Sequence, residues 1–300
     1  MRFSVVLGQW LDRPVGADLD VAVAADALGY PQLWVPEMAK ADSPTMAATI
    51  AARTAQIELV LGPLPVTVRS PVQIALAAQT VAAAGRAVHV ALGTSSTVVA
   101  RWHGTTRIGS AARLEHSVLA LRELFGGGRH HGFRLTQPPD PAPTLTVAAF
   151  GPRAVAAAQH ADRMVLNMVT AATAGRLAPQ HPNTAVWLCA AVDPTDAERE
   201  WLARGFVGYL GAPGYGEMFA DAGFGELVEV ARSGAHPKEL LARMPGELLD
   251  AVALVGDEAT IRRRVAAYAA AGIREIGLVP VASDLPSCSP TLELFRPQPA

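Results

Sequence analysis

The sequence predicts an α/β fold of the (β/α)8 TIM-barrel class, and three observations lead to this prediction. Eight short apolar runs alternate with longer helical patterns along the 300 residues. Most of these runs are apolar without interruption, which is typical of parallel strands buried on both faces. Eight strand-helix units in a chain of this length favour a closed barrel over an open doubly wound sheet. We expect residues 1–300 to form a single domain.

Each expected strand is a short run rich in Val, Ile and Leu. The strands cover residues 3–8, 33–36, 57–62, 87–93, 145–150, 163–168, 185–192 and 275–280. The expected helices cover residues 17–28, 44–55, 71–84, 108–125, 153–160, 195–207 and 257–271. The last helix is the clearest, because Ile261, Val265 and Tyr268 share one face and Gly272 ends it.

Two segments interrupt the alternation and predict insertions after strands four and seven. Residues 126–143 contain Gly-Gly-Gly, His130-His131 and Pro-Pro-Asp-Pro, which favour a long surface excursion. Residues from about 205 to 250 are rich in glycine with short helical pieces, and we expect them to lie over one end of the barrel. We interpret His130 and His131 as a solvated loop pair, and predict no metal site.

The composition indicates which partners to exclude and which cellular compartment to expect. The formal net charge is −2, so the chain has no surplus of Lys and Arg for nucleic acid or anionic lipid, and we expect neither partner. Two cysteines, Cys189 and Cys288, are too few for a disulfide framework and favour a reducing cytoplasm. No apolar run is long enough to span a membrane.

Few reactive side chains follow the expected strands, where the active site of such a barrel lies. The only lysines are Lys40 and Lys238, so Schiff-base chemistry is not expected. No set of histidines and carboxylates converges on a metal, and Glu37 is the one carboxylate at a suitable strand end. When the protein supplies few reactive groups, a cofactor supplies the chemistry.

The stretch Gly151-Pro152-Arg153 opens a helix after the fifth strand. Proline at the first helical position loses nothing by lacking an N–H, and we expect the amides of Arg153, Ala154 and their neighbours to lack acceptors. The first turn holds a cation and no acid, which suits a phosphate at the helix start. The alternative is that Gly-Pro is simply a good helix start, and the residues alone do not decide between the two.

Five segments together resemble the luciferase-like monooxygenase superfamily, and within it the F420-dependent oxidoreductase group of actinobacteria. They are residues 61–86, 88–96 (VHVALGTSS), 113–127 (RLEHSVLALRELFGG), 147–167 (VAAFGPRAVAAAQHADRMVLN) and 255–280. Their order and spacing make the match more specific than any one segment.

The resemblance implies a luciferase-like barrel, commonly a homodimer, that binds F420 or FMN at its carboxyl end. It assigns the support of the cofactor ring to a bulge, often with a cis peptide, formed here by Gly62, Pro63 and Leu64, with a cis bond expected before Pro63 or Pro65. It assigns the ring edge to Gly93, Thr94 and Ser95. It assigns the phosphate to the turn formed by Ala149, Phe150, Gly151, Pro152 and Arg153.

The chain departs from the sugar-phosphate dehydrogenases of this superfamily, whose second-strand loop resembles Asp-His and whose fourth carries a glutamate. Here those places hold Glu37-Met38 and Ser95 or Ser96. His103 is a candidate replacement base and Glu37 a second candidate for moving the proton. A packing or surface role for His103 remains the alternative. Substrate contacts are assigned to Trp10, Met38, Trp102 and Asn167.

The leading hypothesis is hydride transfer between F420 and a small organic substrate. An FMN-dependent luciferase-like monooxygenase is the alternative, and a cofactor-binding barrel without catalysis is a hypothesis of another class. The poly-glutamate tail of F420 needs a basic channel, and Arg69, Arg101, Arg107 and Arg153 are its candidate residues.

Overall fold

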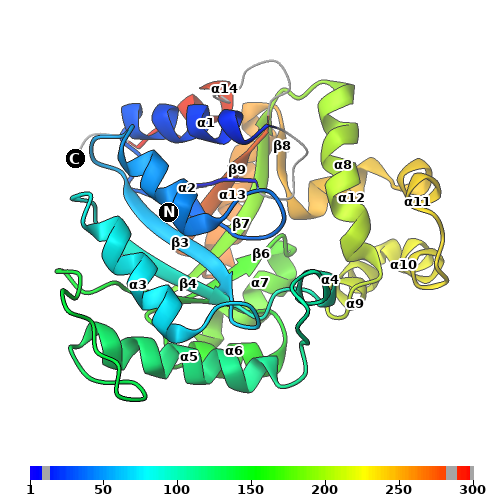
Figure 1. Cartoon of the computed structure of the whole chain (residues 1–300). Helices are drawn as coiled ribbons and strands as arrows, with labels where there is room; N and C mark the ends of the chain where they lie inside the picture. Colours follow the sequence, from blue (N-terminus) through cyan, green and yellow to red (C-terminus); the bar gives the residue numbers. More distant parts are fainter. Residues whose placement is uncertain (9–13, 282–288, 298–300) are drawn as a thin grey trace.

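Nine parallel strands form the central sheet of the computed structural model, which describes residues 1–8, 14–281 and 289–297. The strands in the described residues are β1 Arg2–Val6, β2 Gln32–Val35, β3 Glu58–Pro65, β4 Val88–Gly93, β5 Leu145–Ala148, β6 Arg163–Asn167, β7 Thr184–Val192, β8 Leu254–Gly256 and β9 Glu275–Pro280. Strands β1 to β6 pair in chain order, β6 pairs with β7, β7 with β9, and β9 with β1. Eight strands therefore close into a barrel, and the (β/α)8 prediction is confirmed (Figure 1).

Strand β8 is the one strand in the described residues that the sequence did not predict. It pairs with the last residues of β7, with Leu254 opposite Ala190 and Gly256 opposite Val192. It follows α12 within two residues and is only three residues long. A run this short gives no periodic signal, so the hydrophobic pattern does not reveal it.

Helices surround the barrel, as Figure 1 shows. They are α1 Val15–Ala27, α2 Ser43–Ala51, α3 Pro71–Ala82, α4 Thr97–Trp102, α5 Ser110–Phe125, α6 Pro152–Ala158, α7 Ala171–Leu177, α8 Asp196–Leu210, α9 Tyr215–Phe219, α10 Gly225–Arg232, α11 Pro237–Arg243, α12 Gly246–Val252, α13 Glu258–Ala270 and α14 Ser289–Leu294, with the short elements η1 Ala178–Gln180 and η2 Ala220–Phe224. The seven expected helices correspond to α1, α2, α3, α5, α6, α8 and α13. No helix in the described residues is both long and apolar enough to cross a membrane.

Both expected insertions are present. Residues 126–143 connect α5 to β5 and hold only an isolated bridge between His130 and Phe133. The chain from α8 to α12 lies between β7 and β8 and projects to the right of the barrel in Figure 1. The second insertion is more helical than its glycine content suggests, because α9, α10 and α11 pack against α8.

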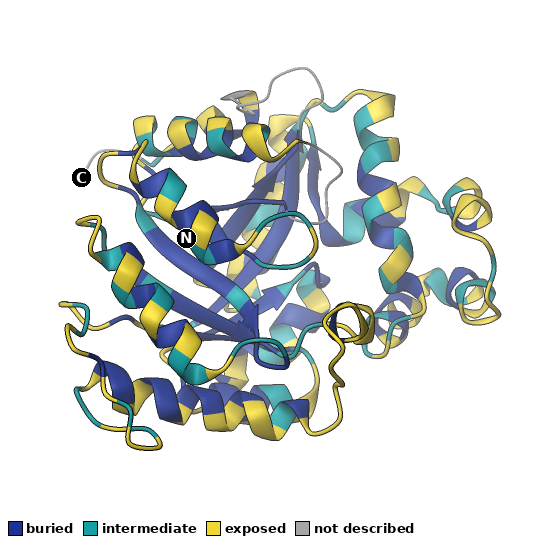
Figure 2. Cartoon of the chain, in the orientation of Figure 1, coloured by how far each residue is buried: buried dark blue, intermediate teal, exposed yellow. Residues whose placement is uncertain are grey.

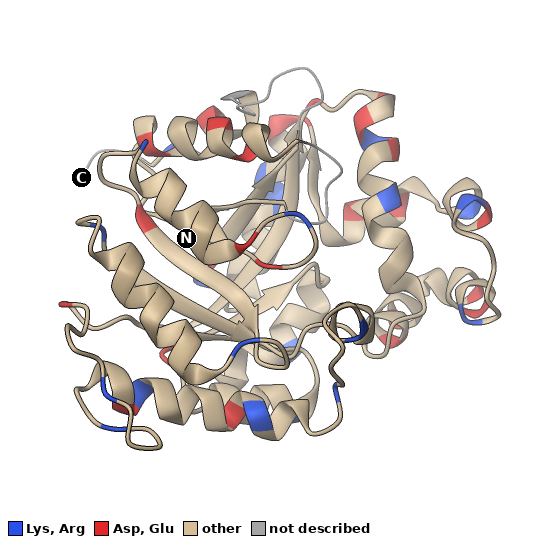
Figure 3. Cartoon of the chain, viewed as in Figure 1, with Lys and Arg blue, Asp and Glu red and all other residues tan. Residues whose placement is uncertain are grey.

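The core consists of the barrel wall and the inner faces of the helices, which are dark blue in Figure 2. Val5, Leu33, Leu61, Val90 and Leu278 are among the fully buried strand residues. The strands are apolar throughout because the barrel interior and the helices bury both of their faces. Most charged residues lie on the outer helices and loops, where both signs are mixed (Figure 3).

One buried polar network lies inside the amino-terminal half of the barrel. The Arg163 Nη1 atom lies 2.9 Å from Oε2 of Glu275 and 3.0 Å from Oε1 of Gln32. The guanidinium of Arg163 also stacks on Trp34, with its carbon 4.2 Å from the ring centroid. Burial lowers the pKa of Arg163, and the Glu275 carboxylate opposes that shift.

Candidate active site at the carboxyl end of the barrel

Backbone strain marks the carboxyl ends of the strands. Four described non-glycine residues have positive φ, and three of them, Ser95, Met168 and Asp193, follow β4, β6 and β7 within two residues. Such conformations cost about 1–3 kcal/mol each and cluster at functional sites. This end of the barrel is therefore the candidate active site, in agreement with the location expected for a TIM barrel.

A bulge in β3 shapes one side of this site. The pairing of β3 with β4 shifts register between Leu61 and Leu64, and the Gly62–Pro63 peptide is cis, as expected for one of two prolines. Gly62 has a φ of 108°, and a Cβ there would lie 2.3 Å from the carbonyl oxygen of Ala91. Only glycine fits this position, because any Cβ would overlap neighbouring backbone atoms. The bulge therefore requires glycine at position 62.

The bulge packs directly on the end of β4. A Cβ at Gly93 would lie 3.2 Å from Cβ of Pro63, and the N–H of Val66 donates to the Gly93 carbonyl at 3.0 Å. Gly62, Leu64, Gly93 and Ala149 are buried, so they shape the backbone around the site. The accessible members of the assigned cofactor residues are Pro63, Thr94, Ser95, Phe150, Gly151, Pro152 and Arg153.

The start of α6 has the features of an anion-binding turn, with one correction to the sequence expectation. The Ala154 N–H is not free, because it donates to the Gly151 carbonyl at 3.0 Å in a tight first turn. In the described part of the chain, the N–H groups of Gly151 and Arg153 have no acceptor and the Arg153 side chain has no ion-pair partner. The first turn contains no acid, and the space around Gly151 is open.

A cleft of about 530 Å³ opens beside the loops that follow β2 and β3. Its lining residues are Glu37, Met38, Ala39, Lys40, Ala41, Asp42, Val68, Arg69, Trp102 and His103. Five of the residues assigned from sequence therefore meet at one cleft, namely Glu37, Met38, Arg69, Trp102 and His103.

Glu37 is held in a fixed orientation at this cleft. Arg69 donates from Nε to Oε1 at 2.8 Å and from Nη2 to Oε2 at 2.7 Å, and the Ser43 N–H donates to Oε2 at 3.1 Å. The Glu37 side chain is only 10% exposed. Its hydrogen bonds raise the pKa of Arg69 above the ordinary value. Both oxygens of Glu37 are thus occupied by donors.

Two further acids, Asp42 and Asp18, pair with the cations Arg69 and Lys40 that line the cleft. Asp42 also pairs with Arg69, and although burial alone raises its pKa, hydrogen bonds from Thr45 and the charge of Arg69 lower it overall. Lys40 pairs with the fully buried Asp18 at 2.8 Å and donates to the Gly8 carbonyl at 3.3 Å. These contacts tie the loop after β2 to the end of β1.

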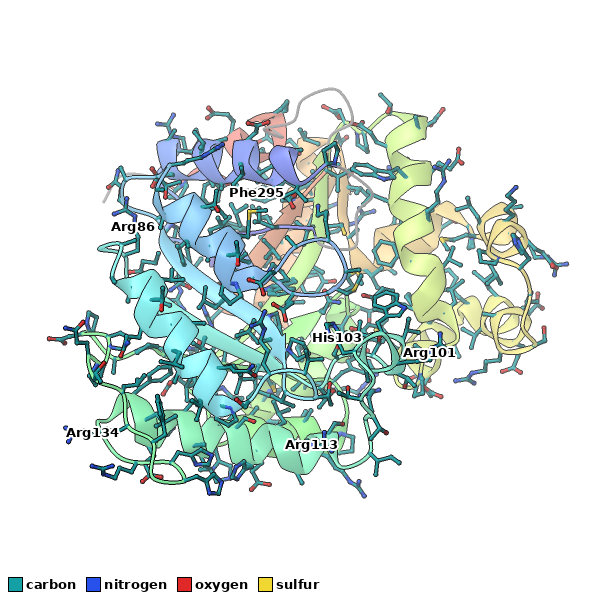
Figure 4. The ribbon with its side chains drawn as sticks, viewed as in Figure 1. Arg86, Arg101, His103, Arg113, Arg134 and Phe295 are labelled. Carbon is teal, nitrogen blue, oxygen red and sulfur yellow. The ribbon has the colours of Figure 1, made fainter. Side chains whose placement is uncertain are left out.

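His103 and Trp102 come from the carboxyl end of α4, a helix that the sequence analysis did not place. Ser96 begins α4 by accepting a hydrogen bond from the Val99 N–H at 3.2 Å. Trp102 is 57% exposed, and no hydrogen bond involves the His103 ring in the described residues. Figure 4 shows His103 near the end of the β3 ribbon, with Arg101 to its right, near the lower end of α8.

Asn167 ends β6 and contacts a residue that sequence reasoning missed. The Tyr215 hydroxyl donates to the Asn167 carbonyl at 2.9 Å, and the Tyr215 ring stacks on Phe150 at 4.6 Å between centroids. The buried Oδ1 atom of Asn167 has no partner among the described residues. Tyr215 belongs to the glycine-rich insertion that was expected over one end of the barrel, but no local pattern reveals its stacking on Phe150.

The four arginines assigned to a basic channel differ in whether their side chains contact other groups. Arg107 donates to the Thr94 hydroxyl at 3.0 Å, and Arg69 is occupied by the two acids. Among the described residues, Arg101 and Arg153 are the two of the four proposed channel arginines whose side chains make neither a hydrogen bond nor an ion pair. Trp10 lies outside the described residues.

Residues 7–275 match the family model for luciferase-like monooxygenases. The chain belongs to this family. Membership confirms the resemblance and places the chain in the luciferase-like class of oxidoreductases, without selecting a cofactor. A search of curated protein sequences finds no significant match.

Solved structures share the luciferase-like fold at low identity. The chain is similar to an F420-dependent secondary alcohol dehydrogenase in complex with an F420-acetone adduct, with TM-score 0.78, 15% identity and 99% of each chain covered. It is similar to the coenzyme F420-dependent tetrahydromethanopterin reductase from Methanopyrus kandleri, with TM-score 0.77, 13% identity and 97% of each chain covered.

A third similar structure contains a different cofactor. It is the oxygenating constituent of 3,6-diketocamphane monooxygenase from Pseudomonas putida in complex with FMN, with TM-score 0.69, 17% identity, and 99% of this chain and 96% of that chain covered. At these identities the similarity shows the fold alone.

Proposed function

We propose that the chain is an oxidoreductase that transfers a hydride between the deazaflavin coenzyme F420 and a small organic substrate. The observation that carries this proposal is the arrangement at one end of the barrel. A glycine-fixed bulge packs against the end of β4, and the start of α6 offers two amides and one cation that have no partner among the described residues. Two similar solved structures, named above, use F420, which supports the same cofactor here.

The residues present fit such a cofactor. Pro63, Thr94 and Ser95 would support its ring, and the amides of Gly151 and Arg153 would hold its phosphate, since free N–H groups at a helix start favour an anion. When bound, the deazaflavin supplies a carbon that donates or accepts a hydride. The protein supplies the binding, the orientation and the exclusion of water.

His103 is the residue proposed to move the accompanying proton. Its ring lies at the cleft and has no protein hydrogen bond in the described residues, so its nitrogens are available to substrate. Glu37 has both oxygens engaged, so we assign it to shaping the cleft with Arg69. Trp102 and Met38 form apolar walls, and the unpartnered Oδ1 of Asn167 accepts from bound ligand.

An FMN-dependent monooxygenase is the second candidate, because the same loops suit either cofactor and one similar structure contains FMN. Arg101 and Arg153 favour F420, since two unpaired cations suit a tail with several carboxylates. Reaction with oxygen separates the candidates, because reduced F420 resists oxygen and reduced FMN does not. Rapid reoxidation in an air-saturated stopped-flow mixture would support FMN.

Titration of the purified chain with F420 and with FMN, followed by absorbance, tests the proposal. We expect saturable binding of F420, weaker binding of FMN, and about tenfold weaker F420 binding in Arg153→Gln, since that change removes a charged contact. Arg53→Gln is the matched control, because Arg53 is exposed between α2 and β3 at the opposite end of the barrel. Dissociation constants above the millimolar range for both cofactors would contradict the proposal.

A further inference from the structure

Three histidines meet on the outside of the barrel, on the connection between α5 and β5. His116 lies on α5, and His130 and His131 lie in the loop that follows this helix. One ring nitrogen from each residue lies within 4.8 Å of the others. We propose that these three imidazoles form a binding site for one divalent transition-metal ion, with Zn²⁺ as the expected ion.

The distances allow this with small side-chain movements. The ring centroids are 4.2 Å apart for His130 and His131, 5.2 Å for His116 and His130, and 6.4 Å for His116 and His131. With Zn–N bonds of about 2.0–2.1 Å, two ligand nitrogens of a tetrahedral site lie roughly 3.4 Å apart. The most separated nitrogens must therefore approach by at most about 1.4 Å, which rotation of exposed rings provides.

The loop is already folded into the required shape. His130 and Phe133 exchange two backbone hydrogen bonds of 2.9 Å, and Phe133 packs against the core. Leu135 is buried, and the Gln137 N–H donates to the Gln79 side chain on α3 at 3.1 Å. These contacts hold the loop back along α5, so metal binding does not have to order a free segment.

The donor set suits a transition metal rather than calcium or magnesium. Neutral imidazole is a preferred ligand of Zn²⁺, Ni²⁺ and Cu²⁺, whereas Ca²⁺ and Mg²⁺ require oxygen ligands. In the described part of the chain, no hydrogen bond to protein occupies the side-chain nitrogens of these three histidines. Two of the rings are exposed, and Figure 4 shows the neighbouring Arg134 at the edge of the molecule, so the ion can enter from solvent.

The site has three protein ligands and one open position, which water fills in the usual four-coordinate geometry. It lies on a connection from a helix to the following strand, at the end of the barrel opposite the candidate active site. A bound metal ion is expected to cross-link the loop to α5. The sequence interpretation of His130 and His131 as a pair missed His116, because a residue 14 positions earlier becomes a neighbour only when the loop folds back.

Metal titration of the full chain without an affinity tag tests this proposal. After removal of metal with chelator, Zn²⁺ binding is measured by calorimetry, and Co²⁺ is added separately to record the absorption bands of tetrahedral coordination. We expect one Zn²⁺ per chain, and at least about tenfold weaker binding in His116→Gln, His130→Gln and His131→Gln. Zn²⁺ is also expected to raise Tm of the unmodified chain and not of these variants.

His160→Gln is the matched control, because His160 is exposed, lies outside the cluster and pairs with Glu115. This variant is expected to bind Zn²⁺ as the unmodified chain does. Metal-free Tm values equal to that of the unmodified chain will show that the variants are folded. The proposal is overturned if no tetrahedral Co²⁺ spectrum and no saturable Zn²⁺ binding are found, or if His116→Gln binds both ions unchanged.

Discussion

Arg69 and Glu37 join the loops after β3 and β2 through two parallel hydrogen bonds of 2.8 and 2.7 Å. The Arg69 guanidinium also contacts Asp42, so one cation organises two acids at the edge of the cleft. The pair is largely buried, with side-chain exposures of 19% and 10%. A bidentate pair of this kind fixes orientation as well as charge.

Removing one partner of this pair should damage stability and the cleft together. Arg69→Met leaves Glu37 and Asp42 without their cation, and we expect the free energy of unfolding to fall by about 3 kcal/mol. The double variant Arg69→Met with Glu37→Gln should recover part of this loss, because the uncompensated carboxylate is gone. Chemical denaturation of Arg69→Met, of Glu37→Gln and of the double variant measures the coupling energy between the two side chains. Strictly additive losses would show that the pair is unimportant.

His103→Gln tests the proposed proton transfer. Once a substrate is established, we expect turnover to fall about 100-fold, the scale of a lost general acid or base, while the cofactor dissociation constant stays unchanged. His236→Gln is a suitable control, because His236 lies at the start of α11 in the insertion after β7. Unchanged turnover in His103→Gln would assign this histidine to the surface.

The alkaline limit of stability should depend on the tyrosines. Burial raises the pKa of all four tyrosines, and that of Tyr209 to about 12. A raised folded-state pKa gives stability that is complete below the unfolded value near 10 and is lost as pH rises towards the folded value. Ultraviolet titration should therefore show little tyrosinate at about pH 10.5 and a cooperative rise on unfolding.

The variant Tyr209→Phe isolates one of these contributions. Its stability should fall less steeply than that of the unmodified chain between about pH 10 and pH 12, because one group with a raised pKa is absent. Urea unfolding at several pH values measures the slopes. Independent ionisation of several tyrosines near pH 10 in the folded chain would contradict the burial seen in the structure.

The network at the amino-terminal half of the barrel supports stability rather than chemistry. Among the residues that the structure describes, Arg163→Met leaves the buried Glu275 with only Arg2, at 3.4 Å, as a cationic partner. We expect a loss of about 3–5 kcal/mol, as for other broken buried pairs. Adding Glu275→Gln should restore part of it. A loss below about 1 kcal/mol for the single variant, measured by denaturant unfolding, would show that water or a rearranged side chain replaces Arg163.

The sequence was sufficient to predict the barrel, because its signals are local. Uninterrupted apolar runs such as the one ending at Val192 mark strands, and caps such as Asp257 mark helix starts. Strand β8 and helix α4 were not predicted, since three and six residues are too few for a periodic pattern. Tertiary pairing with β7 and the cap at Ser96 specify these elements instead.

The site was only partly predictable, because distant segments assemble it. Gly62 lies within β3 and Gly93 ends β4, and the family resemblance rather than a local pattern assigned them to the site. Tyr215 stacks on Phe150 across a long insertion, and the partners of Glu37 depend on how two loops meet. A single sequence predicts neither contact, because each joins segments that become neighbours only in the folded chain.

The most direct test of the central claim is a crystal structure of the chain soaked with F420. We expect density for the ring beside Pro63 and Gly93, with the phosphate at the amides of Gly151 and Arg153. Density for the cofactor at another place on the barrel, or none at saturating concentration while those amides face protein side chains, would contradict the account.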